Sequence, residues 1–317
     1  RTATDHIDLF FLIFILIAVF FAVRAIKSQK LYFSILSGVF IGLAILSKWL
    51  PALIVVGVWG ILAFNKISWK QFFLQFIMML SFATIVALPW QIYIYTYFPE
   101  QAAWEASLNM QHITNVLDNQ SGSFWYHFVK MGKIYGELFY LVVLWMLYKS
   151  FKSVKSFKKS RYRLALLAWI LVPYLFFSFT ATKMQAYTLF AAPAIFISTA
   201  FFAEYLLKTK HKFKRNWLPI VLLIVLFALP IRYNIERLKF FEKQDRNPQW
   251  TQNIKNLKIK LGENTEKLVI VNATHPIETM FYINCIAYDF SFDAEKIIEI
   301  EKHGYKVIDY QNWINSK

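Results

Sequence analysis

The feature that most constrains the fold is a long apolar stretch from Leu31 to Phe64, LYFSILSGVFIGLAILSKWLPALIVVGVWGILAF, in which Lys48 is the only formally charged residue. As one helix its 34 residues would reach about 51 Å, against a bilayer hydrocarbon core of about 30 Å, so the stretch must fold back on itself. The turn is predicted near Lys48, because Pro51 suits the first turn of a new helix and an ammonium at the bilayer centre would cost at least about 2.5 kcal/mol. Lys48 is therefore expected at a membrane surface, where an interfacial anchoring role is equally compatible with its position.

The composition is typical of a polytopic membrane protein. Of 317 residues, 57% are hydrophobic, 19% aromatic and only 17% charged. The net charge of +16 could indicate nucleic acid, but the cations cluster in short connections between apolar runs, which favours membrane orientation instead. We therefore expect membrane lipid, and no nucleic acid, as a partner. Cys285 is the only cysteine, so neither a disulfide framework nor a Cys/His zinc cluster is predicted.

The chain is predicted to be an α-helical polytopic membrane bundle of about eight transmembrane helices with a small C-terminal α/β soluble domain. The spans are expected near residues 9–26, 31–47, 50–64, 71–93, 134–148, 164–180, 187–207 and 217–231. Alternate connections are rich in Lys and Arg and are cytoplasmic by the positive-inside rule. Lys183, the long loop 94–133 and the tail then lie outside. The predicted division places the membrane domain at 1–232 and the extracytoplasmic tail domain at 233–317.

The loop 94–133 holds most of the polar residues on the predicted outer side. A loop of this length in a compact bundle is more often functional than idle, and its first part has the apolar spacing of an amphipathic surface helix. The candidate substrate-contacting residues of this loop are Glu105, His112, Trp125 and Tyr126. A solvated loop with interfacial aromatic residues is the alternative. No HxxxH or HExxH spacing occurs, so no cofactor is firmly predicted and a divalent metal is left open.

Charged residues also stand at two predicted span ends. Asp5 and Asp8 precede the first span, where the helix dipole favours a carboxylate by about 0.3–1 kcal/mol, so capping alone explains one of them. Lys183 and Tyr187 are four residues apart, which on a helix places the ammonium and the phenol on one face. At headgroup level this pair could bind a lipid phosphate or act only as interfacial anchors.

Five segments in chain order resemble the integral-membrane glycosyltransferases of family 39, which are of the protein O-mannosyltransferase and lipid A aminoarabinose-transferase type with the GT-C fold. The segments are TDHIDLFF, GVFIGLAILSKWLPAL, ALPWQIY, NMQHITNVLDNQSGSFWYHF and FSFTATKMQAYTLFAAPAIFI. The resemblance covers roughly residues 1–200. It implies a glycosyltransferase that moves a hexose or pentose from a polyprenyl-phosphate carrier to a protein or lipid acceptor in the cell envelope, outside the bacterial cytoplasmic membrane.

The resemblance also implies roles for individual residues. Asp5 would be the family's acidic residue near the active site, whereas Lys48, Lys183 and Tyr187 would lie near the carrier phosphate. By the same resemblance, the principal catalytic acidic residue of the family would lie in a first external loop, upstream of anything in this chain. We therefore expect the chain to be a carboxy-terminal portion that is inactive by itself. Departures from the family pattern, such as Lys48 followed by Trp49 where the family has Lys-Gly, leave the subfamily open.

The tail from about Tyr233 predicts a separate soluble unit. The runs LVIVNA, IAYDF and KVIDY are typical of strands, and they alternate with helical patterns in HPIETMFYIN and DAEKIIEIEKHGY. This alternation predicts a small parallel α/β layer. No phosphate-binding loop is present, so an accessory or acceptor-facing domain is the interpretation.

Two other functional classes stay open from the sequence. A lipid-linked-sugar flippase or polymer-handling membrane protein would share the basic inner connections, but it is expected to carry ionisable residues deep within its spans, where few are visible. A non-catalytic membrane anchor that presents the α/β tail would need neither the long loop nor the two lysine-containing turns.

Overall fold

The computed structural model describes residues 6–117, 120–152, 157–238, 249–262 and 265–315. The chain divides into two compact units, Arg1–Lys239 and Phe240–Lys317, and each is described by itself. Asp5 lies outside the described residues.

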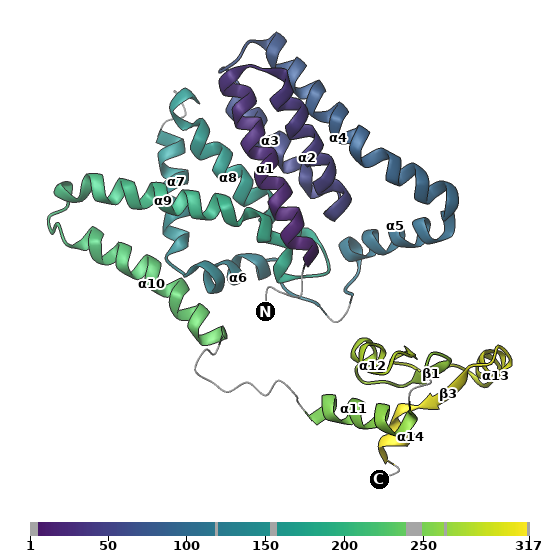
Figure 1. The fold of residues 1–317 in the computed structure, drawn as a ribbon. Coiled ribbons are helices and arrows are strands. Elements are labelled where there is room, and N and C mark those ends of the chain that lie inside the picture. Colours follow the sequence, from purple (N-terminus) through teal and green to yellow (C-terminus); the bar gives the residue numbers. More distant parts are fainter. Residues whose placement is uncertain (1–5, 118–119, 153–156, 239–248, 263–264, 316–317) are drawn as a thin grey trace. The chain divides into compact units, whose positions relative to one another are not determined.

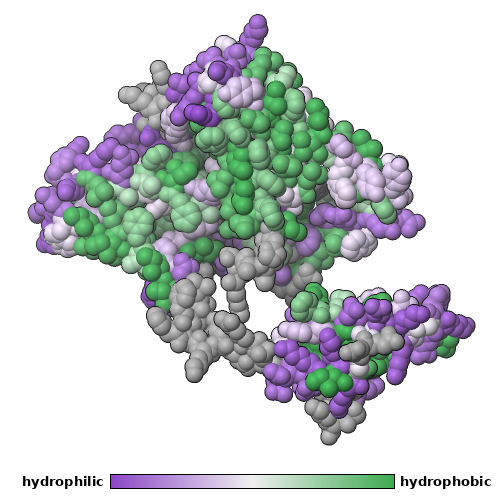
Figure 2. All heavy atoms as spheres, viewed as in Figure 1, coloured by the Kyte–Doolittle hydropathy of each residue, from purple (hydrophilic) through white to green (hydrophobic). Residues whose placement is uncertain are grey.

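The first unit is entirely helical (Figure 1). Its elements are α1 (His6–Ser28), α2 (Leu31–Lys48), η2 (Leu50–Leu53), α3 (Ile54–Ala63), α4 (Trp69–Tyr97), α5 (Pro99–Thr114), α6 (Tyr126–Tyr135), α7 (Phe139–Lys152), α8 (Phe157–Phe179), η3 (Gln185–Ala191), α9 (Ala192–Thr209), η4 (Lys210–Lys212) and α10 (Leu218–Leu238). Hydrophobic residues cover much of its visible surface, as expected for a face in contact with lipid (Figure 2).

The prediction of a polytopic helical membrane bundle is confirmed. Within the described residues, six helical segments are long and apolar enough to cross a membrane. These are Ile7–Ser28, Leu31–Lys48, Trp69–Tyr97, Ser160–Phe179, Gln185–Lys212 and Leu218–Glu236. The predicted span 134–148 instead falls on α6 and α7, which meet at a 110° bend and count as a seventh span only if taken together. The predicted span 50–64 is a shorter apolar helix, because η2 occupies its first residues.

The predicted break at Lys48 is confirmed. Helix α2 ends at Lys48, Trp49 has a left-handed φ of 64°, and η2 begins with Pro51 in its first turn. The chain then returns along the bundle, since the Trp59 indole of α3 donates to Gln75 Oε1 at 3.3 Å and Gln75 Nε2 donates to the Ala25 carbonyl of α1 at 3.1 Å. These interhelical hydrogen bonds satisfy polar groups that water cannot reach.

Helices α2 and α4 pack closely because glycines face α4. A Cβ added to Gly38 would lie 2.4 Å from the Met79 carbonyl oxygen, and one added to Gly42 would lie 2.6 Å from the Val86 Cβ. Small residues four apart allow this close approach of membrane helices. The contact fixes α2, and therefore Lys48 at its end, against the rest of the bundle.

The second unit is a small α/β layer, which confirms the fold predicted for the tail. It comprises α11 (Gln249–Leu261), β1 (Leu268–Val271), α12 (Pro276–Ile283), β2 (Ile286–Ala287), α13 (Ala294–Lys302), β3 (Lys306–Asp309) and α14 (Tyr310–Asn315). The strands are parallel in the order β2-β1-β3, with Val269 opposite both Ile286 and Val307. The predicted division after residue 232 falls within α10, whereas the compact units divide after Lys239.

Candidate functional site

An ion pair joins the start of α1 to the end of α2. Lys48 Nζ donates a hydrogen bond to Asp8 Oδ1. Asp8 lies in the first turn of α1 and Lys48 in the last turn of α2, where the helix dipoles favour a carboxylate and an ammonium respectively. Asp8 is 6% exposed, whereas the Lys48 side chain retains 23% of its surface. A ligand can therefore reach the ammonium more easily than the carboxylate.

Tyr187 and His112 extend this ion pair into a polar cluster. Lys48 Nζ lies 5.2 Å from the centroid of the Tyr187 ring, a distance at which a cation is attracted to an aromatic face. The Tyr187 hydroxyl and His112 Nδ1 are 3.3 Å apart and form a hydrogen bond. Four elements therefore contribute one residue each: α1 contributes Asp8, α2 Lys48, η3 Tyr187 and α5 His112. We refer to these four residues as the polar cluster.

Lys183 is in a different environment from Lys48. It is 5% exposed, and its Nζ donates to the carbonyls of Phe177, Ser178 and Thr180 at 3.1, 2.6 and 2.5 Å. These carbonyls lie at the C-terminal end of α8, which attracts a cation. Burial lowers the pKa of Lys183 from its ordinary value. An ammonium has three N–H groups, so this network accounts for all the donors of Lys183.

The segment that carries Lys183 is also hydrogen-bonded to the middle of the long loop, at and just after the end of α5. The backbone amides of Ala181 and Lys183 each donate at 2.8 Å, to the carbonyls of Ile113 and Gln120 respectively. The Thr182 hydroxyl donates to the Asn115 carbonyl at 2.8 Å. These contacts hold the end of α5, where His112 lies, against the segment that leads into Tyr187.

Most of the long loop is helical. The amphipathic helix predicted at its start is confirmed as α5, while α4 continues to Tyr97 and α6 begins at Tyr126. Of the four candidate substrate residues, the structure brings only His112 to the polar cluster. Glu105 is exposed on α5, Trp125 is 61% exposed, and the ring of the half-buried Tyr126 lies 5.3 Å from Lys130 Nζ.

Asp8 is the residue whose role the sequence did not reveal. Capping of α1 explained its presence, yet its carboxylate is the ion-pair partner of Lys48. A signal was available in the pattern: the two residues lie at comparable distances on either side of the tight turn between the first two spans. In an antiparallel pair of helices such residues come together. In the described part of the chain, no group of three or more His, Cys, Asp or Glu side chains could hold a metal ion.

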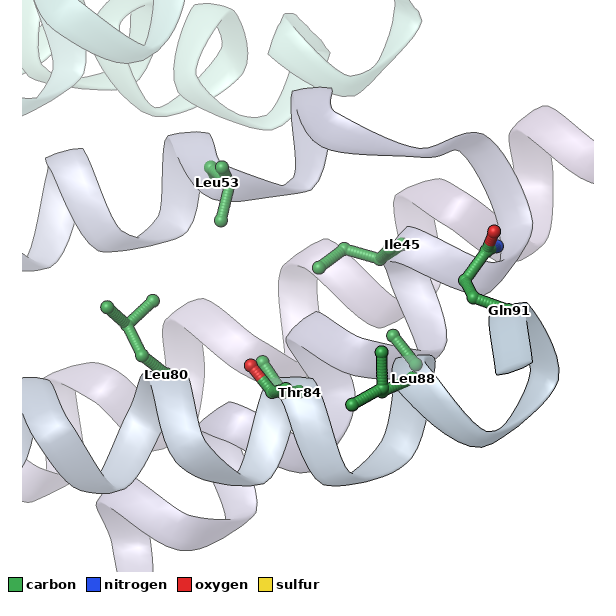
Figure 3. Close-up of a pocket in the computed structure, with 8 residues that line it drawn as sticks. Ile45, Leu53, Leu80, Thr84, Leu88 and Gln91 are labelled. Atoms are coloured by element: carbon green, nitrogen blue, oxygen red, sulfur yellow. The ribbon is translucent and has the colours of Figure 1, made fainter. Parts of the chain in front are cut away.

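An apolar groove lies between α2, η2 and α4 (Figure 3). It has a volume of about 190 Å³ and is lined chiefly by aliphatic side chains such as Ile45, Leu53 and Leu80. Gln91 is a polar residue of its lining. Ile45 precedes Lys48 by one helical turn in α2, so the groove and the polar cluster share one helix end.

One of three comparisons with known proteins finds a similar protein. No protein-family model matches the chain, and no curated protein matches it. Among solved structures, the chain is similar to the crystal structure of ArnT from Cupriavidus metallidurans bound to undecaprenyl phosphate, with a TM-score of 0.57 and 14% sequence identity. The match covers 97% of this chain and 66% of that chain, so the chain spans less than two thirds of its neighbour. At this identity the likeness shows the fold alone, a helical membrane fold similar to that of ArnT.

Proposed function

We propose that this chain is part of a membrane glycosyltransferase that moves a hexosyl or pentosyl group from a polyprenyl-phosphate carrier to a protein or lipid acceptor. The reaction would occur on the outer side of the bacterial cytoplasmic membrane. The observation that carries the proposal is the polar cluster, in which a partly exposed ammonium at a helix end adjoins a phenol. The ArnT structure holds undecaprenyl phosphate, which supports a lipid phosphate as the ligand class.

The phosphate of the carrier would bind to Lys48 and Tyr187. Lys48 supplies a charge-assisted contact. The Tyr187 hydroxyl can donate its one hydrogen to the phosphate in the state in which His112 Nδ1 carries a hydrogen and donates it to the phenol oxygen. Lys183, the other lysine with this expected role, has its three N–H groups on backbone carbonyls. Direct contact of Lys183 with phosphate stays a prediction, and it would require one of these hydrogen bonds to break.

The hydrocarbon part of the carrier needs an apolar surface near the phosphate site. The groove between α2 and α4 meets this need, because its lining is mostly aliphatic and its α2 wall lies one turn from Lys48. The hydrocarbon chain of the carrier already lies in the bilayer, so its transfer into this groove adds packing contacts and not the gain of leaving water. The phosphate contacts would therefore supply most of the preference for this site.

In the transfer step, the bond between the sugar C1 and the phosphate oxygen breaks and its electron pair stays on the phosphate. Lys48 would stabilise this added negative charge, as preorganised cations do in phosphate departure. A base must also accept the acceptor's proton. We propose Asp5 for a role near this reaction, with the main acidic residue expected upstream of this chain, and we propose Glu105, Trp125 and Tyr126 as contacts of the substrates.

The test is sugar transfer by the purified full-length protein from a radiolabelled polyprenyl-phosphate sugar. Lys48→Met retains the aliphatic stem and removes the charge-assisted contact, which typically contributes about 1.5–3 kcal/mol, so carrier affinity or rate should fall roughly ten- to hundred-fold. Lys130→Met is the matched control, because Lys130 also lies over a tyrosine ring, that of Tyr126, but outside the polar cluster. Equal activity of both variants would remove Lys48 from the site.

The same preparation separates the alternative functions. Movement of a labelled carrier across vesicle membranes without sugar transfer would indicate a flippase. Absence of transfer, movement and carrier binding would indicate a membrane anchor.

A further inference from the structure

The ammonium that the proposed function assigns to the carrier phosphate already has a counter-ion. Lys48 Nζ is hydrogen-bonded to Asp8 Oδ1. A phosphate that binds to Lys48 must therefore either replace this carboxylate or share the ammonium with it. In both cases the negative charge of Asp8 affects which phosphates bind well.

Asp8 cannot move far from a phosphate bound at Lys48. It lies in the first turn of α1, its side chain has only one carbon between the backbone and the carboxyl group, and it is 6% exposed. Helix α1 is packed along α2, where the Ser37 hydroxyl donates to the Ala18 carbonyl at 2.9 Å. The carboxylate thus stays near the ammonium whether or not the hydrogen bond persists.

We infer that Asp8 is a specificity-determining residue that weakens binding of the doubly charged product phosphate relative to the singly charged sugar-phosphate donor. This inference rests on the proposed function. The donor is a phosphodiester with one negative charge. When its bond to the sugar C1 breaks and the electron pair stays on the phosphate, the product is a monoester that gains a second negative charge. A fixed carboxylate beside Lys48 repels the product more strongly than the donor.

Weaker binding of the product than of the donor would help the enzyme to release the spent carrier after each reaction. An isolated lysine would hold the product more tightly than the donor, because attraction grows with the charge of the ligand. The carboxylate of Asp8 offsets part of that difference and so favours release of the spent carrier. His112 reaches the cluster through the Tyr187 hydroxyl.

The test compares two ligands that differ by one charge. Farnesyl phosphate and its methyl ester would be titrated into the purified protein in nanodiscs at pH 8, where the second proton of a phosphate monoester, with a pKa of about 6, has been lost. The variants are Asp8→Asn, which removes the charge and keeps the shape, and Asp8→Glu, which keeps the charge.

We expect Asp8→Asn to raise affinity for both ligands, with a gain about ten-fold larger for farnesyl phosphate than for the methyl ester. Asp8→Glu should retain the discrimination of the unmodified protein. If Asp8→Asn does not fold, Asp8→Ser carries the same expectation, because its smaller hydroxyl can still accept a hydrogen bond from Lys48.

Two results would overturn the inference. The first would leave the proposed function standing, and the second would contradict it as well. Equal changes for both ligands in the neutral variants, with the unmodified protein still binding both, would reduce Asp8 to a structural partner of Lys48 and leave the proposed function standing. Failure of the unmodified protein to bind either ligand would overturn the inference together with the proposed function.

Discussion

The Tyr187 hydroxyl lies 3.3 Å from His112 Nδ1, and this hydrogen bond connects the surface helix α5 to the short η3 helix inside the bundle. The two residues are far apart in the sequence, and the Tyr187 ring in turn lies under the Lys48 ammonium. His112 therefore positions Tyr187, and through it can affect the phosphate site that we propose at Lys48.

Tyr187→Phe should weaken binding of a polyprenyl phosphate while preserving the ring beneath Lys48. Loss of one hydrogen bond of about 0.5–1.5 kcal/mol corresponds to roughly a two- to ten-fold increase in Kd. His112→Gln should have an effect of similar size, and the two substitutions together should cost less than the sum of the single effects, because the pair acts through one hydrogen bond. A double-mutant cycle on carrier binding measures this. Strict additivity would contradict the coupling.

The contact between α2 and α4 gives a prediction about stability. Gly38→Ala places a Cβ 2.4 Å from the Met79 carbonyl oxygen, so the helices must move apart at a cost of about 1–3 kcal/mol. Gly60→Ala in α3 is the matched control, because no atom lies within 4 Å of its added Cβ and alanine is the better helix former. Thermal unfolding in detergent should show a lower Tm for Gly38→Ala alone. Similar Tm values for both variants would mean that α2 and α4 are less closely packed than described.

The sequence predicted the helices well because the bilayer leaves few alternatives. A stretch as long and apolar as Leu31 to Phe64 has to break, and its one lysine and one proline marked where. Prediction was poorer where a span is not a single straight helix. The predicted span 134–148 crosses the bend between α6 and α7, where Gly136 adopts a φ of 87° close to Pro230 of α10. The local apolar pattern continues through Gly136 and so does not record the bend.

The candidate site was predicted less completely than the fold. Lys48 and Tyr187 stood out because charge and hydroxyl groups at apolar span ends need an explanation, and the structure brings these two together. Asp8 did not stand out, since a carboxylate at a helix start is explained by the dipole alone. The three carbonyls bound by Lys183 were also beyond prediction, because a lysine's backbone partners depend on how the chain turns after α8.

The orientation predicted from the Lys and Arg distribution can be tested by cysteine labelling. In a Cys285→Ser background, a cysteine introduced at Ser121 should react with a membrane-impermeant thiol reagent in intact cells, whereas one at Ser28 should react only after the membrane is opened. Both positions are exposed in the described structure, so the membrane side, and not burial, decides the result. The reverse labelling pattern would invert the proposed topology.

Asp309 gives the tail unit a sensitivity to acid. Its Oδ1 accepts hydrogen bonds from the backbone amides of Asn312 and Gln311 at 3.0 and 2.8 Å, and Oδ2 accepts one from Asn272 Nδ2 at 2.7 Å. Chiefly the bond from Asn312 lowers the pKa of Asp309 below its ordinary value. A carboxyl whose pKa is lower in the folded state stabilises that state above the pKa of the unfolded chain, and this contribution is lost as pH falls through the lower, folded-state pKa.

Amide exchange at the start of α14 should therefore accelerate on acidification below about pH 4, beyond the intrinsic dependence on pH. Asp309→Asn should abolish most of this extra dependence, since the amide does not ionise. Hydrogen exchange mass spectrometry on the full chain, with α11 as an internal reference, provides the measurement. An unchanged pH dependence in the variant would assign the effect to another group.

Substitutions at Lys48 and at Lys183 should affect different properties of the protein, carrier binding in the first case and stability in the second. Lys183→Met removes a donor from three carbonyls near the C-terminal end of α8. The Phe177 carbonyl still accepts from the Thr180 hydroxyl, but those of Ser178 and Thr180 lose the ammonium, and a buried acceptor left in this way typically costs about 1–3 kcal/mol, so the variant should unfold at a clearly lower temperature. Lys48→Met alone would leave the buried Asp8 carboxylate without its counter-ion, so it is combined with Asp8→Asn, and the principal effect of the pair should then be on affinity for the carrier. Measuring Tm and carrier Kd for both variants tests the contrast. A Lys183→Met protein that keeps its Tm but loses carrier binding would show that Lys183 gives up its carbonyls to bind the phosphate, and would restore it as a direct ligand.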